Sequence, residues 1–191
     1  MTGNLVRVER GIRKGISIGN GFSYEGSRIT TSANRAVLFN VLLNRFYIDF
    51  SKVSCADFCC GGGIVGFEML SLGAMECLFI DSDRKKLANV SLAINKLNFN
   101  ANAVCCYLPN IGMLNKQFDI IFFDPPYDNN FCNETIKEIF DKNLITDDGY
   151  LIVETKQDIN TYNFKTEHIK YLKNGAKFVF LKKLQHYDHK R

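Results

Sequence analysis

The sequence lacks any apolar run long enough to cross a bilayer as a helix. Its first residues, MTGNLVRVERGIRKG, contain no apolar core region and no cleavage-like site, so we expect no secretory signal. Internal repeats and low-complexity tracts are absent as well. Together these absences exclude a membrane-spanning or secreted class, and we expect a cytoplasmic protein with no membrane partner.

Metal-ligand patterns are also missing. Histidine is scarce, at three residues, and the seven cysteines form no C-x-x-C or Cys/His ligand set. The two closely spaced histidines, His186 and His189, lie in a polar C-terminal tail, where a frayed terminus is a better interpretation than a metal site. We therefore expect reduced thiols and no metal.

The composition is that of one globular domain. The chain has 191 residues, of which 46% are hydrophobic and 23% charged, enough to bury a substantial core. The net charge of +4 permits a polyanionic partner without requiring one.

Hydrophobic patterning predicts alternating strands and helices. Short apolar runs predict strands at 53–58, 76–80, 103–107, 118–123 and 150–154, and helical spacing predicts helices at 64–72, 83–97 and 131–140. Two further strand-like runs, 167–172 and 177–184, are joined through Asn174-Gly175, a favoured two-residue hairpin turn. This order predicts an α/β fold with a doubly wound, mostly parallel sheet and a C-terminal antiparallel hairpin. Residues 1–35 form a basic extension outside the domain at 36–191.

Three predicted strands end in residues suited to ligand binding, and ligands bind beyond the carboxyl ends of strands in open α/β sheets. "DFCCGGGIVG" spaces Gly61, Gly63 and Gly66 as G-x-G-x-x-G, and Asp81 ends the next strand, where a carboxylate can take two ribose hydroxyls. The third end is "DPPY", residues 124–127. Each motif alone could be a tight turn, a helix N-cap or a structural turn. Their combination, in order, favours a nucleotide-like cofactor.

The Asp-Pro-Pro-Tyr turn indicates the chemistry. An exocyclic amine on an aromatic base is a poor nucleophile, because its lone pair is delocalised into the ring. If the Asp124 carboxylate and the Pro125 carbonyl accept its N–H bonds, the lone pair can be aligned for attack. Pro126 stiffens the turn, and Tyr127 can stack on the base. A dinucleotide oxidoreductase would share the glycines and Asp81 but would not need this turn.

At this point the chain resembles the RsmD family. The segments "GSRITTSANRAVLFNVL", "DFCCGGGIVGFEMLSLGA", "FIDSDR" and "FDIIFFDPPYDNN" look like successive motifs of these bacterial methyltransferases, which methylate N2 of a guanine in 16S ribosomal RNA. The resemblance implies the Rossmann-like class I methyltransferase fold, S-adenosylmethionine as cofactor and direct transfer to the amine. Carried over by motif, it implies cofactor contacts at Asp57, Cys59, Gly61, Gly63, Asp81 and Ser82, and a guanine held by Asp124, Pro125, Pro126 and Tyr127.

The resemblance also implies an RNA surface near the N-terminus, with 16S RNA, within a small-subunit particle, as the partner of a monomer. The candidate contacts are Arg10, Arg13, Lys14, Arg28, Thr30 and Arg35, the first three on a glycine-punctuated stretch that could form a β-hairpin. A solvated terminus is an equally good interpretation of that stretch, and either Arg28 or Arg35 could pair with a surface carboxylate.

Other functions stay open. The chain could be an amino-methyltransferase with another target, such as adenine N6 in DNA or RNA or a protein glutamine, although glutamine-directed relatives usually have Asn before Pro-Pro. It could be a non-catalytic RNA-binding assembly factor, against which intact Asp81 and Asp124 argue, or a nicotinamide oxidoreductase. Nucleophilic catalysis by Cys59 or Cys60 is disfavoured because no histidine lies near them in the sequence.

Overall fold

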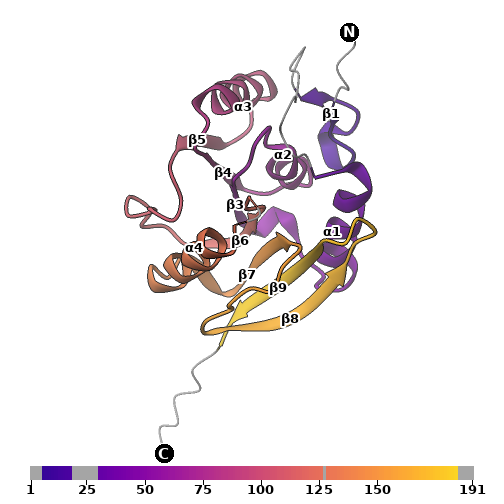
Figure 1. Ribbon diagram of the computed structural model, residues 1–191. Helices are drawn as coiled ribbons and strands as arrows, with labels where there is room; N and C mark the ends of the chain where they lie inside the picture. Colours follow the sequence, from indigo (N-terminus) through magenta and orange to yellow (C-terminus); the bar gives the residue numbers. More distant parts are fainter. Residues whose placement is uncertain (1–5, 19–29, 127, 185–191) are drawn as a thin grey trace, which may run out of the picture.

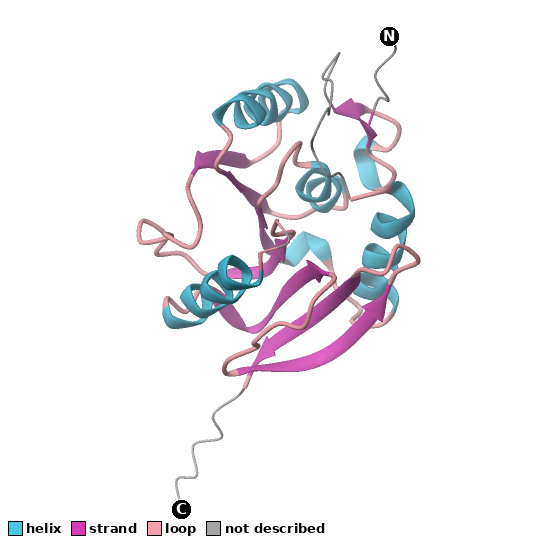
Figure 2. Cartoon of the chain, viewed as in Figure 1, coloured by secondary structure: helices cyan, strands magenta, loops and turns pink. Residues whose placement is uncertain are grey.

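A seven-stranded sheet forms the centre of the molecule (Figures 1 and 2). The computed structural model describes residues 6–18, 30–126 and 128–184. The strand order is β5-β4-β3-β6-β7-β9-β8, in which the first five strands run parallel and β9 runs antiparallel to both neighbours. The strands are β3 (Ser54–Phe58), β4 (Glu76–Asp81), β5 (Ala101–Cys105), β6 (Phe118–Phe123), β7 (Ile145–Thr155), β8 (Phe164–Tyr171) and β9 (Lys177–Lys183). This confirms the predicted α/β fold with a C-terminal antiparallel hairpin.

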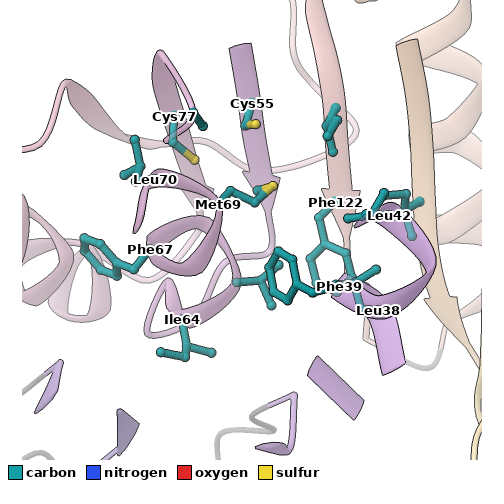
Figure 3. Close-up of a cluster of buried hydrophobic side chains, with 14 of the residues drawn as sticks. Leu38, Phe39, Leu42, Cys55, Ile64, Phe67, Met69, Leu70, Cys77 and Phe122 are labelled. Atoms are coloured by element: carbon teal, nitrogen blue, oxygen red, sulfur yellow. The ribbon is translucent and has the colours of Figure 1, made fainter. Parts of the chain in front are cut away.

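Helices cover both faces of the sheet. The helices are α1 (Ser32–Asn44), α2 (Ile64–Ser71), α3 (Arg84–Leu97) and α4 (Asn129–Asp141). Buried side chains of α1, α2 and α3 share one core with alternate residues of the strands, and those of α4 share the other. Figure 3 shows part of the first core, which includes Phe39 of α1, Met69 of α2 and Phe122 of β6. Strand β6, "FDIIFF", is apolar almost throughout because it is buried on both faces.

The N-terminal segment packs beside this sheet. Strands β1 (Val6–Arg7) and β2 (Ser17–Ile18) pair antiparallel around a short 3-10 helix, η1 (Gly11–Arg13), and a second 3-10 helix, η2 (Phe50–Lys52), precedes β3. Thr31 caps α1, since its side chain accepts a hydrogen bond from the Asn34 N–H. The boundary predicted after residue 35 falls within this helix.

The turn of the C-terminal hairpin differs from the prediction. Gly175 has a positive φ of 79°, but Asn174 does not share it, so the turn is not the predicted pair of left-handed residues. The Gly175 N–H donates to the Leu172 carbonyl, and the Leu172 N–H donates to that of Ala176. Three residues, 173–175, therefore lie inside the closing pair Leu172 and Ala176, which is the other common way of closing a hairpin and places glycine last.

No helix among residues 6–18, 30–126 and 128–184 is long and apolar enough to cross a membrane.

Candidate active site

The carboxyl ends of β3, β4 and β6 meet at the point where the strand order reverses. The chain runs outward from β3 to β4 and β5, then returns to place β6 on the other side of β3. A crevice at such a point is the usual ligand site in this kind of sheet. A cavity of about 330 Å³ opens there, within the size range of small-molecule sites. Six predicted residues line it: Cys59, Gly61, Asp81, Ser82, Asp124 and Pro126.

The glycines after β3 serve two purposes. Gly61 has a φ of 54°, and a Cβ added there would meet nothing within 4 Å, so this part of the loop offers bare backbone to the cavity. Gly66 lies in α2, where an added Cβ would come within 2.3 Å of the Phe79 ring. Gly66 therefore allows α2 to pack against β4, and only the start of the loop meets the cavity.

Asp81 organises the loop as well as lining the cavity. One carboxylate oxygen accepts a hydrogen bond from the Gly61 N–H at 2.8 Å, and the other accepts from the Asp83 N–H at 2.9 Å. The side chain is thereby held with defined orientation at the end of β4. A carboxylate with about four acceptor positions can still accept hydroxyl donors in this arrangement.

Asp57 lies beneath the loop, outside the lining of the larger cavity. It is buried, and its carboxylate accepts the Gly66 N–H at 2.9 Å. Burial raises its pKa to about 8; the Gly66 hydrogen bond opposes this, and the nearby charges of Asp124 and Asp81 add to it. Asp57 therefore supports the start of α2 and can hold a proton at neutral pH.

Cys59 is held in an uncommon conformation, with a φ of 57°. Its thiol lines the cavity, but burial, followed by the charge of Asp81, raises the thiol pKa well above its ordinary value. Burial also raises the pKa of the Cys60 thiol. Both groups stay protonated at neutral pH, which agrees with packed thiols and argues against nucleophilic catalysis.

The turn after β6 is anchored at both ends. The Asp124 N–H donates to the Phe58 carbonyl of β3 at 3.3 Å, and the Asp128 side chain caps α4 by accepting the N–H groups of Asn130 and Phe131. Between these anchors, Pro125 is buried and Pro126 is exposed. Tyr127 lies outside the described residues.

A second, smaller recess also borders Asp124. Its volume is about 20 Å³, and its lining includes Val6, Thr30, Asp57, Cys59 and Asp124. Cys59 and Asp124 also line the larger cavity, so the two spaces meet at these side chains. At the smaller recess, Val6 of the N-terminal segment and Thr30, two residues before α1, lie near the end of β6.

Two of the predicted RNA contacts, Arg35 and Thr30, are buried and make hydrogen bonds within the fold. Arg35 is 3% exposed, and its guanidinium pairs with the fully buried Glu68 of α2 at 2.7 Å. It also donates to the Thr30 carbonyl at 2.7 Å. Thr30 is 7% exposed and donates through its hydroxyl to Glu154 at 3.4 Å. The prediction that Arg35 contacts RNA conflicts with this burial, and we correct Arg35 to a structural role. Thr30 also lines the smaller recess, so its contact with RNA stays a prediction.

Two arginines of the N-terminal segment, Arg10 and Arg13, also face the domain. Arg10 pairs with Glu68 at 3.3 Å and lies over the Phe39 ring, and Arg13 donates to the Leu97 carbonyl at 3.1 Å. A Cβ on Gly11 would come within 1.8 Å of the Ser71 carbonyl oxygen, so this turn is pressed against α2. The predicted contact Lys14 is exposed. Arg28 lies outside the described residues.

Sequence reasoning missed five residues that line the larger cavity: Lys86, Cys106, Tyr107, Leu108 and Phe131. Cys106, Tyr107 and Leu108 directly follow β5, so the rule that sites form at strand ends could have found them. Lys86 and Phe131 lie in the first turns of α3 and α4, for which the sequence offered no comparable indication.

Comparisons with known proteins agree with this architecture. The model of the family described as "Conserved hypothetical protein 95" matches residues 6–182. Ribosomal RNA small subunit methyltransferase D of Escherichia coli (strain K12) is 32% identical over 138 residues, covering 69% of this chain and 65% of that protein. Its namesake in Haemophilus influenzae is 28% identical over 147 residues, covering 70% of each chain.

The fold is shared with solved structures as well. The structure described as "Putative methyltransferase yhhF" from Escherichia coli aligns with a TM-score of 0.80 at 22% identity, covering 95% of this chain and all of that one. The chain has the class I methyltransferase fold and belongs to the family of conserved hypothetical protein 95, the RsmD family.

Proposed function

We propose that this protein transfers a methyl group from S-adenosylmethionine to the exocyclic N2 amine of a guanine in 16S ribosomal RNA. The position of Asp124 carries the proposal, because this carboxylate borders both the cavity that contains Asp81 and the recess that contains Thr30. A group that orients an amine toward a methyl donor must lie at the edge of the donor's cavity, and Asp124 lines that cavity. The names of the relatives support RNA of the small subunit as the target.

The larger cavity fits S-adenosylmethionine. Asp81 would accept the ribose hydroxyls, and the bare backbone at Gly61 leaves room beside Cys59 for the amino-acid portion. Two carboxylates, Asp81 and Asp124, line the cavity, which suits a ligand with positively charged groups. When bound, S-adenosylmethionine supplies a methyl group attached to a positively charged sulfur.

The chain's own contribution is to position the amine. The Asp124 carboxylate and the Pro125 carbonyl accept N–H bonds, so the amine lone pair turns away from the ring system. Because the turn is anchored to β3 through the Asp124 N–H and to α4 through Asp128, both acceptors are in place before the base arrives. Tyr127 would stack on the base, and the chain would act as a monomer on the RNA within a small-subunit particle.

Transfer of label tests the proposal directly. Tritium from labelled S-adenosylmethionine should enter small-subunit RNA, offered both naked and in a particle, and nucleoside analysis should find it in N2-methylguanosine. Label in another nucleoside would reject guanine N2 as the target, and no transfer to either substrate would reject the function.

A further inference from the structure

Glu154 is the neighbour of Asp124 across the sheet. Strands β6 and β7 are parallel, and Phe123 is the Cα partner of Val153. Asp124 and Glu154 each follow this pair by one residue. Because adjacent strands lie about 4.8 Å apart, two acidic residues are held side by side at the carboxyl edge of the sheet.

The two carboxylates belong to the same face of the sheet. Phe122 and Ile152 pack in the core beneath α1, whereas Phe123 and Val153 pack in the core beneath α4. Side chains alternate along a strand, so Glu154 of β7 returns to the α1 side. Asp124 directly follows β6 and lines the same recess as Thr30 and Phe122. The contacts of Glu154 with Thr30 and with α1 agree with this direction.

The Glu154 side chain is held in a defined orientation. One carboxylate oxygen accepts from the Thr30 hydroxyl at 3.4 Å, and the other accepts from the Asn34 side-chain amide at 3.3 Å. Thr30 also lines the recess that Asp124 borders. These two bonds fix the direction in which the carboxylate points. The partly exposed Glu154 is thus an oriented acceptor beside the proposed target site.

A second acceptor beside Asp124 matches the edge of guanine. Guanine carries a proton on N1 next to its N2 amine, and both groups are donors. A purine without the N1 proton presents a lone pair there, which an ionised carboxylate repels. We propose that Glu154 accepts the N1–H of the target guanine while Asp124 engages the amine, so that Glu154 selects purines with a protonated N1. This inference rests on the proposed function.

Base analogues test the selection. 2-Aminopurine keeps the exocyclic amine at C2 but has an unprotonated N1. We would place guanine or 2-aminopurine at the position that the wild-type protein methylates, in otherwise identical RNA, and compare kcat/KM. The wild-type protein should prefer guanine at least a hundredfold, since a site built around a hydrogen bond rejects the analogue that lacks it. Glu154→Gln should reduce this preference at least tenfold, because an amide can donate to N1.

Glu167→Gln on the edge strand β8 provides the matched control and should keep the wild-type preference. An unchanged preference in folded Glu154→Gln would overturn the inference and leave Glu154 as a clamp for α1. If the wild-type protein methylates guanine and 2-aminopurine with equal kcat/KM, that result alone would overturn the inference. If the wild-type protein transfers no methyl group to guanine RNA, the proposed function itself fails, and this inference fails with it.

Discussion

At the scale of one residue, a substitution of Asp124 distinguishes a methyltransferase from a non-catalytic RNA-binding protein. We expect Asp124→Ala to slow methyl transfer by about 100-fold or more, because the amine loses the acceptor that aligns its lone pair. Asp124→Asn should keep part of the activity, since the amide oxygen can still accept. Single-turnover methylation at saturating cofactor measures the rate, and calorimetry should find cofactor affinity within a few-fold of wild type. A wild-type rate in Asp124→Ala would make the turn structural.

Asp57 should make stability depend on pH. Its folded pKa of about 8 lies above the unfolded value, so between about pH 4 and pH 8 the folded state holds a proton that the unfolded state has released. The free energy of unfolding should therefore fall as pH rises through this window, by up to about 1.4 kcal/mol per pH unit, and level off above it.

Asp57→Asn isolates this contribution, because the amide oxygen can still accept the Gly66 N–H but carries no titrating proton. In urea unfolding at pH 5, 6.5 and 8, the free energy of unfolding of the variant should increase relative to that of the wild-type protein as pH rises. Parallel pH profiles for the two proteins would mean that Asp57 is ionised in the folded state.

At the scale of elements, one buried carboxylate joins three segments. Glu68 of α2 pairs with Arg35 of α1 and with Arg10 of the N-terminal segment. Arg35→Met should lower the free energy of unfolding by about 3 kcal/mol, because it removes the closest partner of a buried charge. Urea unfolding measures this loss, and Lys52→Met, in an exposed pair with Asp49, should change little. A loss no larger than that of Lys52→Met would contradict the role of this network.

Sequence patterns predicted elements well where burial alone determines them. The strand at 118–123 has the predicted bounds because both of its faces are buried. Strand β7 begins at Ile145, whereas the sequence predicts it only at 150–154. The prediction starts too late because Thr146, Asp147 and Asp148 in the first half of the strand are typical of a turn. Those polar groups are satisfied by distant partners: Asp119 accepts from Thr146, and β9 supplies Lys182 and Lys183. Local strand propensity cannot predict partners that are distant in the sequence.

The candidate site, like the secondary structure, was predictable only where the local sequence determines it. Residues that end strands were found from the pattern alone, because parallel strands bring their carboxyl ends to one edge. The burial of Arg35 could not be predicted from the sequence, because an arginine near the start of a helix has the same local sequence whether it faces solvent or a buried Glu68. Glu154 likewise becomes a candidate only when the register of β6 and β7 is known.

For the whole molecule, the fold changes which basic residues can meet RNA. A basic N-terminal stretch invites the view that all its cations contact phosphates, but Arg10 and Arg13 hold this segment against α2 and α3. Arg7 and Lys14 are the exposed cations of residues 6–18. The segment therefore divides into residues that attach it and residues that can reach a polyanion.

This division predicts opposite behaviour for two double variants. Replacing Arg7 and Lys14 with alanine should weaken RNA binding and flatten the slope of log affinity against log salt by about 0.7 to 0.9 for each phosphate that is no longer neutralised. Replacing Arg10 and Arg13 should chiefly lower the free energy of unfolding, because Glu68 and the Leu97 carbonyl lose their partners. RNA binding across a salt series and urea unfolding of both variants measure the two effects, with cofactor affinity as the control for the first variant. If the Arg7/Lys14 variant keeps the wild-type slope of log affinity against log salt, the RNA phosphates contact another surface of the protein. If the Arg10/Arg13 variant flattens the slope without losing stability, these side chains leave the domain to bind RNA.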